Sequence, residues 1–167
     1  AMLCEGNVQE VMDLSPVAHL AALSGKVPFI NFFDGFRTSH EIQKIAVWDY
    51  KDLADMCDMD AVKAFREHAL NPEHPAMRGS HENGDTFFQH REACNQYYDA
   101  LPEVVEKYMG KINEKLGTDY KLFNYYGAPD ADRVIIAMGS INDVAEEVID
   151  YMNAHGEKVG LVKVRLY

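Results

Sequence analysis

The chain has 167 residues, the length of one ordinary domain or of two small ones. Its 47% hydrophobic and 26% charged residues are a globular composition, and it contains no apolar run of membrane-spanning length. Acidic residues outnumber basic ones 27 to 16, and the net charge of −11 argues against a nucleic acid or an anionic membrane as partner. The three cysteines (Cys4, Cys57 and Cys94) are too few and too scattered for a disulfide framework, so we expect a cytoplasmic protein.

The N-terminal residues predict a strand followed by a helix. Residues 1–4 are a short apolar run, and Asn7 predicts a helix N-cap because Glu10 follows three residues later in the capping-box arrangement. Apolar residues then recur at helical spacing as far as Gly25, a typical helix terminator. Pro16 predicts an interruption of this helix, because proline lacks the N–H and clashes with the carbonyl four residues back.

A second strand and helix follow. Residues 27–33 are the nearly continuous apolar run of a strand buried on both faces of a parallel sheet. After a turn, residues 38–41 predict another capping box, which opens a helix containing Ile42, Ile45 and Ala46. The alternation indicates an α/β fold built from strand–helix units with a parallel sheet.

The middle of the chain is predicted to be helical. Apolar residues at helical spacing predict helices near 58–69 and 95–116. Between them, residues 71–85 are rich in turn-forming residues, and a loop of this length is usually functional or an interaction segment. We expect residues 117–132 to be a connector.

The C-terminal residues predict a βαβ unit. Residues 134–138 form a buried strand, a helix begins near Ser140 and ends at Gly156, and residues 159–167 form a final strand. The chain thus begins and ends inside strands, whereas domains usually end in exposed polar segments. We therefore expect a fragment of a larger protein; the alternative is that Ala1 is a cloning remnant before an initiating Met2.

The turn at residues 34–41 is the strongest candidate for a binding role. Ligands collect outside the carboxyl ends of parallel strands, and the N-terminus of a helix favours anions. Arg37 and His40 would add a positive charge and a titratable group, and Thr38 would cap the helix. The alternative, equally supported, is that these residues only stabilise the turn.

Four of the seven histidines lie in the middle segment: His68, His74, His81 and His90. Acidic residues lie near them, but the spacing matches no known pattern of metal ligands. We interpret these histidines as solvated loop residues and expect no metal site.

Several longer runs resemble pyruvate:ferredoxin (flavodoxin) oxidoreductase. They are residues 7–14 (Asn-Val-Gln-Glu-Val-Met-Asp-Leu), 32–41 (Phe-Phe-Asp-Gly-Phe-Arg-Thr-Ser-His-Glu), 71–75 (Asn-Pro-Glu-His-Pro), 123–131 (Phe-Asn-Tyr-Tyr-Gly-Ala-Pro-Asp-Ala) and 156–167 (Gly-Glu-Lys-Val-Gly-Leu-Val-Lys-Val-Arg-Leu-Tyr). Because the runs follow one another along the chain, the resemblance covers essentially all of it.

The resemblance implies an incomplete fragment of a large, dimeric, multidomain enzyme. Residues 1–120 would be the C-terminal part of the domain that binds the pyrimidine end of thiamine diphosphate. Residues 121–167 would be the N-terminal βαβ part of a domain similar to the C-terminal domain of transketolases.

The resemblance also implies the activity of the parent enzyme. Such enzymes use thiamine diphosphate, Mg and [4Fe–4S] clusters to decarboxylate pyruvate to acetyl-CoA, and pass the electrons to ferredoxin or flavodoxin. The family's pyruvate-binding arginine and thiamine-activating glutamate precede the stretch represented here, and its diphosphate-binding Gly-Asp-Gly…Asn segment follows it. Thr86 follows Gly84-Asp85, so that motif is absent, and three cysteines cannot supply four cluster ligands.

We therefore expect no catalytic residue, no bound cofactor and no oxidoreductase activity in the isolated chain. By resemblance, Arg37, Thr38 and His40 would lie behind the groups that contact thiamine and substrate and would shape the electrostatics of that cavity. As partners we expect the remaining domains of the parent enzyme, and ferredoxin or flavodoxin through them. We also expect the isolated chain to form a homo-oligomer, because its terminal strands would present unpaired edges.

Two alternatives come from other classes of protein. One is a non-catalytic scaffold or interaction module of the same ancestry. The other is a metal-binding protein that uses the histidine-rich middle segment. Within the enzyme class, a related 2-oxoacid in place of pyruvate stays an open alternative, because the substrate-contacting residues are not in this stretch.

Overall fold

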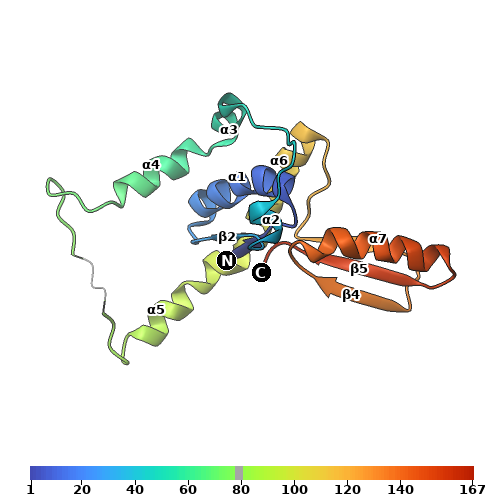
Figure 1. Cartoon of the computed structure of the whole chain (residues 1–167). Coiled ribbons are helices and arrows are strands. Elements are labelled where there is room, and N and C mark those ends of the chain that lie inside the picture. The colour runs from blue at the N-terminus through green and yellow to red at the C-terminus, as the bar shows by residue number, and fades with distance from the viewer. Residues whose placement is uncertain (78–80) are drawn as a thin grey trace.

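The computed structural model describes residues 1–77 and 81–167. Figure 1 shows α1 and α6 near the centre, α7 with β4 and β5 on one side, and α3 to α5 extending away from them. This arrangement confirms the α/β class with parallel strand–helix units. In chain order the elements are β1 (Met2–Cys4), α1 (Val8–Gly25), β2 (Ile30–Phe32), α2 (Arg37–His40), α3 (Tyr50–Met56), α4 (Met59–Glu67), α5 (Phe87–Ala93), α6 (Asn95–Leu116), β3 (Phe123–Gly127), β4 (Arg133–Ala137), α7 (Ile141–Ala154) and β5 (Val159–Val164).

The first unit is a parallel β1–α1–β2 arrangement, with Leu3 opposite Asn31 in the register. Its main core lies between α1 and α6, where buried side chains such as Leu14, Val17, Val105 and Ile112 pack together. The predicted strand over residues 27–33 shortens to β2 and has exposed residues, so the expectation of a strand buried on both faces is wrong. Two short strands cannot supply the covered faces of a full parallel sheet.

Helix α1 runs without interruption through Pro16, contrary to the prediction. Proline at this position leaves the carbonyl of Met12 without its usual N–H partner four residues on. The indole Nε1–H of Trp48 donates to that carbonyl instead, at 3.2 Å. A tertiary hydrogen bond therefore replaces the helical one that Pro16 cannot make.

Residues 41–49, here called the strap, are extended rather than helical, so the predicted helix through Ile42, Ile45 and Ala46 is wrong. The strap crosses α1 and is held by the Gln9 side chain, which accepts from Ala46 N at 2.8 Å and donates to Ala46 O at 3.2 Å. Ile42 is fully exposed, so a helix here would have had no core for its apolar side chains to face.

The two helices predicted in the middle segment are confirmed as α4 and α6. The short helices α3 and α5 were not predicted; each has only seven residues and none of them is buried. The predicted loop over 71–85 agrees with the structure where it is described, although residues 78–80 of that loop lie outside the described residues. The expected connector over 117–132 instead contains strand β3.

The second unit is a three-stranded sheet with the order β3-β5-β4. The predicted βαβ unit is confirmed, because β4 and β5 are parallel and are connected by α7. β3 pairs with β5 in the antiparallel direction. The C-terminal strand is therefore central and has a neighbour on each side, so the expectation that it would present a free edge is wrong.

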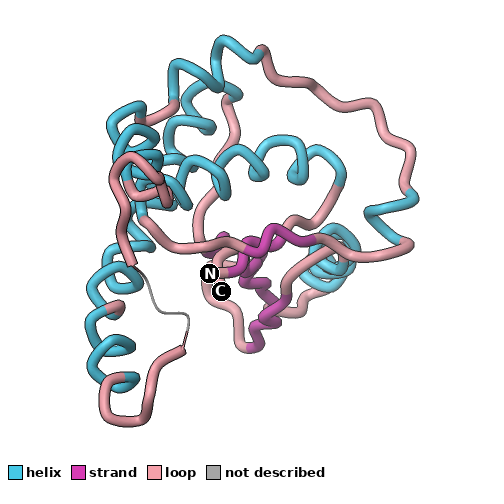
Figure 2. Tube along the Cα trace, turned by 90° about the vertical axis from the view of Figure 1, so that its left-hand side faces the viewer, coloured by secondary structure: helices cyan, strands magenta, loops and turns pink. Residues whose placement is uncertain are grey.

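The last residues of the chain connect the two units. Beyond β5, residues 165–167 lie beside β1 on the side opposite β2: Cys4 N donates to Arg165 O at 2.9 Å, and Met2 N donates to Tyr167 O at 2.7 Å. Figure 2 shows the two termini next to each other. β1 thereby gains a second neighbour, and the carboxyl ends of strands from both sheets meet.

Candidate functional site

Four of the five buried polar or charged side chains in the described part of the chain lie where the two units meet. These groups form a polar contact surface, here called the seam, between the N-terminal unit and the β3–β5 sheet with α7. It consists of Cys4, Glu5, Gly6, Asn7, Glu10, Asp34, Thr38, Asn124, Gly139, Ser140, Asn142, Asp143 and Arg165.

Asp34 connects the turn after β2 to the start of α7. Its carboxylate accepts a hydrogen bond from Ser140 N at 2.5 Å. Ser140 is the N-cap of α7 but makes no capping bond with its own side chain, so Asp34 supplies the negative charge that a helix N-terminus favours. Gly139 has a φ of +81°, and a Cβ there would lie 2.6 Å from Asp34 Oδ2. Glycine is therefore required by both the backbone conformation and the closeness of Asp34.

Glu10 and Arg165 form the central ion pair of the seam. Glu10 Oε1 accepts from Arg165 Nη2 at 2.7 Å, and the Arg165 side chain is 5% exposed. Arg165 also donates to Asn124 Oδ1 and lies over the ring of Tyr120. The predicted N-cap is confirmed, because Asn7 Oδ1 accepts from Glu10 N at 2.9 Å. The return bond, however, goes from Gly6 N to Glu10 Oε2, at 2.8 Å.

Asp13 extends the polar contacts along α1. Its carboxylate accepts from Tyr120 Oη at 2.8 Å and from Gln9 Nε2 at 2.9 Å. Burial raises the pKa of Asp13, while these two hydrogen bonds oppose the rise. Burial, together with the bond to Asp13, also raises the pKa of Tyr120. Residues just before β3 are thus fixed to the first helix.

Glu5 follows β1 directly and is completely buried. Within the described part of the chain, four buried side-chain atoms lack a hydrogen-bond partner: Glu5 Oε1, Glu5 Oε2, Asn142 Oδ1 and Arg165 Nε. All four belong to the seam. Burial first, and the negative charge of Glu10 second, raise the pKa of Glu5 to about 8. Burial, with Glu5, Asp34 and Glu10 nearby, raises the pKa of the Cys4 thiol to about 11.

The three candidate residues of the 34–41 turn separate in the structure. Thr38 is buried, and its hydroxyl donates to Gly6 O at 3.5 Å, so it contributes to the seam. It lies inside α2 rather than at its N-cap, so the prediction that it caps the helix is wrong. Arg37 and His40 are exposed; the His40 ring stacks on Phe36 with 5.2 Å between centroids.

The histidines of the middle segment do not converge. Nδ1 of His90 lies 2.6 Å from Glu82 Oε1, and Nδ1 of His68 lies 3.0 Å from Ala64 O. Over residues 1–77 and 81–167, no group of three or more His, Cys, Asp or Glu side chains is arranged to hold a metal ion. In the same residues, no helix is long and apolar enough to cross a membrane.

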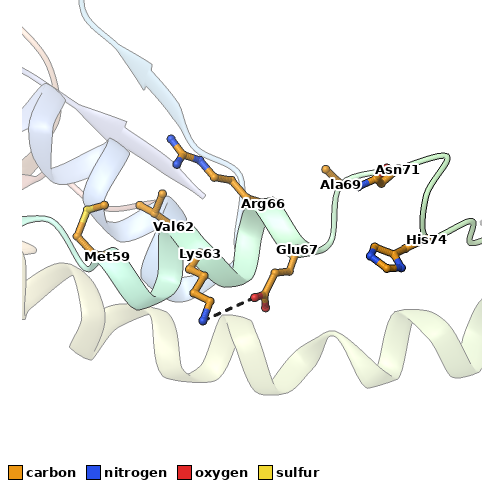
Figure 3. Close-up of a pocket in the computed structure, with 8 residues that line it drawn as sticks. All are labelled: Met59, Val62, Lys63, Arg66, Glu67, Ala69, Asn71 and His74. Atoms are coloured by element: carbon orange, nitrogen blue, oxygen red, sulfur yellow. Dashed lines mark ion pairs between the residues drawn. The ribbon is translucent and has the colours of Figure 1, made fainter.

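A hollow of about 540 Å³ lies on α4 and the turn that follows it. Figure 3 shows Lys63 and Glu67 side by side, as an ion pair of 3.9 Å, with Arg66 directed to the other side of the helix. All the lining residues come from one helix and one turn, so no separate elements bring polar groups together there. The seam, not this hollow, contains the buried functional groups.

The seam was not visible in the sequence. Only the capping pair Asn7 and Glu10 and the turn containing Asp34 had a local signal. Arg165 and Ser140 are 155 and 106 positions away from their partners, so no local pattern could connect them.

Fold and seam together define an α/β chain in which a strand–helix unit is joined to a second small sheet through buried polar groups. Two family models match it in chain order. "Pyruvate flavodoxin/ferredoxin oxidoreductase, thiamine diP-bdg" matches residues 1–110, and "Pyruvate:ferredoxin oxidoreductase core domain II" matches residues 131–167. The chain belongs to the pyruvate:ferredoxin/flavodoxin oxidoreductase family.

Curated relatives match the whole chain. It is 62% identical to the pyruvate-flavodoxin oxidoreductase of Enterobacter agglomerans, 60% to that of Klebsiella pneumoniae and 57% to the pyruvate:ferredoxin oxidoreductase of Moorella thermoacetica. In each case the alignment covers 100% of this chain and 14% of the relative. The chain is therefore part of a much longer protein.

A solved structure supports the fold. The chain aligns with a 2-oxoglutarate:ferredoxin oxidoreductase from Magnetococcus marinus with a TM-score of 0.54 and 19% identity, over 99% of this chain and 30% of that one.

Proposed function

We propose that this chain is the structural joint between two domains of an enzyme that decarboxylates pyruvate to acetyl-CoA with thiamine diphosphate and passes electrons to ferredoxin or flavodoxin. The observation that supports this most is the pair of family models, because one contains Glu10 and the other contains Arg165, its ion-pair partner in the seam. We place the pyrimidine-binding domain in residues 1–120 and core domain II in residues 121–167.

The described residues do not themselves fit the cofactors of such an enzyme. Asp34 is bound to Ser140 N and Glu10 to Arg165, Glu5 is completely buried, and the three thiols are not paired. Four thiolates hold an iron–sulfur cluster, and this chain has three cysteines. We therefore propose that thiamine diphosphate, Mg and [4Fe–4S] clusters are bound elsewhere in the parent, in the cytoplasm.

Within this chain, Arg37 and His40 are the residues we propose to act toward the parent's substrate cavity. Both side chains are exposed, so they are free to face a neighbouring domain. In the full-length enzyme, Arg37→Ala should lower the turnover number more than it lowers the melting temperature. An unchanged turnover with a lowered melting temperature contradicts this role.

A chimera tests the proposed function as a whole. The corresponding segment of the full-length Enterobacter agglomerans enzyme is replaced by this chain, and pyruvate-dependent reduction of a dye is measured. We expect the chimera to keep the activity, whereas the isolated chain should have none. A folded, cofactor-loaded chimera without activity, or an active isolated chain, contradicts the proposal.

We also propose that the isolated chain forms homo-oligomers. Among the described residues, strand β4 has one neighbour in its sheet, β5, and Val134, Ile135 and Ile136 of β4 are 46 to 73% exposed. Light scattering at high concentration should therefore give a mass above that of the monomer. A monomer at all concentrations contradicts this expectation.

A further inference from the structure

Glu5 is an uncompensated buried carboxyl group at the junction of the two units. It is completely buried, and both of its carboxyl oxygens lack a hydrogen-bond partner within the described residues. A carboxylate in such a position loses its hydration, which the backbone of Glu5 itself offsets only in part, so the neutral acid is the form that burial favours.

The charged groups around Glu5 make its ionisation still less favourable. From α1, Glu10 brings a negative charge next to it; from β1, the neighbour is the Cys4 thiol. Elsewhere in the seam, Asp34 of the turn after β2 is bound to Ser140 N, and Asp143 of α7 is bound to Asn7 Nδ2.

Arg165 is the cation of this group, and its guanidinium is already bound to Glu10 and Asn124. Among the described seam residues, an ionised Glu5 would therefore have no unengaged cation to pair with.

We propose that the protonated form of Glu5 holds the seam closed, and that loss of its proton to solvent opens the joint between the N-terminal unit and the β3–β5 sheet. Opening would let water reach the Glu5 carboxylate, at the cost of the seam contacts such as Cys4 N to Arg165 O and Asp34 to Ser140 N. The joint is thus sensitive to pH, whatever reaction the parent enzyme catalyses.

The direction of the pH dependence follows from the two pKa values. In the closed seam the pKa of Glu5 is about 8, and in an open, solvated seam it returns toward the model value of 4.5. Between these two values the closed form binds more protons than the open form. The equilibrium constant for closure is therefore largest below the lower pKa. It falls about tenfold per pH unit between the two pKa values and is constant above the upper one.

Amide hydrogen exchange tests the proposal on the full 167-residue chain. Protection factors, corrected for intrinsic exchange, are measured for the seam amides of Cys4 and Ser140 and for the core amide of Tyr108. In the wild type we expect the two seam protection factors to fall about 100-fold over two pH units between the two pKa values, while Tyr108 stays protected. Parallel loss at Tyr108 would mean whole-chain unfolding and would overturn the proposal.

Two variants identify the titrating group. Glu5→Gln cannot ionise, so its seam protection should not change with pH over this range. The matched control Glu147→Gln removes an exposed carboxylate of α7 and should behave like the wild type. If Glu5→Gln loses protection as the wild type does, the proposal is wrong.

A second measurement keeps the test decisive if Glu5→Gln does not fold. The carboxyl carbon of Glu5 is followed by ¹³C NMR titration in the wild-type chain. We expect its midpoint well above the ordinary value for glutamate but below about 8, the pKa in the closed seam, because opening on deprotonation lowers the midpoint. A midpoint within about one unit of the ordinary value for glutamate would show a hydrated, ionised carboxylate and overturn the proposal.

Discussion

The bond from Trp48 to Met12 predicts a specific energetic coupling with Pro16. Pro16 cannot donate to Met12 O, and the Trp48 indole occupies that carbonyl at 3.2 Å in a partly buried position. Trp48→Phe keeps an aromatic ring but removes the donor. Leaving a buried carbonyl unsatisfied costs about 1–3 kcal/mol, and we expect a loss in unfolding free energy of this size.

The same substitution should cost less when residue 16 carries an N–H. In the Pro16→Ala background, Ala at position 16 donates to Met12 O within the helix, so the carbonyl keeps a partner after Trp48→Phe. The double-mutant cycle should therefore give a coupling free energy of about 1 kcal/mol or more. Pro16→Ala alone should stabilise the chain, because proline inside a helix costs up to about 3 kcal/mol.

Urea unfolding followed by far-UV circular dichroism measures these free energies. Tryptophan fluorescence is unsuitable, because Trp48 is the single tryptophan of the chain and is lost in two of the variants. Tyr50→Phe is a control that removes a polar group next to the strap, where the side chain is 88% exposed, and should change stability by less than about 0.5 kcal/mol. If Trp48→Phe lowers the unfolding free energy equally in both backgrounds, the Trp48 hydrogen bond does not replace the helical one and the predicted coupling is refuted.

Three further predictions concern the seam. Gly139→Ala should lower the unfolding free energy by about 1–3 kcal/mol, because φ of Gly139 is positive and the added Cβ would meet Asp34. In the control Gly84→Ala the added Cβ meets nothing within 4 Å, so the unfolding free energy should change little. Equal effects of the two substitutions in urea unfolding contradict this. Arg165→Met should lower the unfolding free energy by about 3–5 kcal/mol, because it leaves the Glu10 carboxylate uncompensated. Lys158→Met breaks an exposed ion pair and should lower it by less than about 1 kcal/mol. A similar loss for both variants would show that burial adds nothing to the pair of Arg165 and Glu10. Cys4 should react with N-ethylmaleimide at about pH 6, where Glu5 in the closed seam is protonated, at least about tenfold more slowly than Cys94, because burial raises the pKa of the Cys4 thiol to about 11. Equal labelling by mass spectrometry argues against a closed seam.

The sequence predicted the elements whose signals are local and strong. The long amphipathic helix α6, the capped start of α1 and the β4–α7–β5 unit are all as expected, because each is determined by periodicity and by residues at its own ends. The errors occurred where a distant partner overrides a local rule. Pro16 is tolerated because Trp48 supplies a donor, and the strap is extended because Gln9 binds Ala46.

The sequence indicated where the candidate site lies but not what its polar groups bind. The turn containing Asp34 was expected either to bind a ligand, since it follows a parallel strand and precedes a helix, or only to stabilise the turn. In the structure, its carboxylate instead binds the N-terminus of α7, so the anion at this helix start comes from the same chain. Ligand binding and the observed contact both place an anion at a helix N-terminus, and only the tertiary contact between Asp34 and Ser140 distinguishes them.

The seam also explains how so small a C-terminal unit is held in place. The core of the β3–β5 sheet with α7 has three buried apolar residues, Ile149, Val159 and Leu161, which is little for an independent domain. It is fixed to the N-terminal unit by the polar, partly unsatisfied contacts of the seam and by Leu122 and Leu166, which pack with the main core. Apolar side chains in place of the seam residues would hold the two units together more tightly, but their contacts would not depend on pH. A seam of carboxylates with one arginine instead holds the two parts of the chain in an orientation that the ionisation of Glu5 can release.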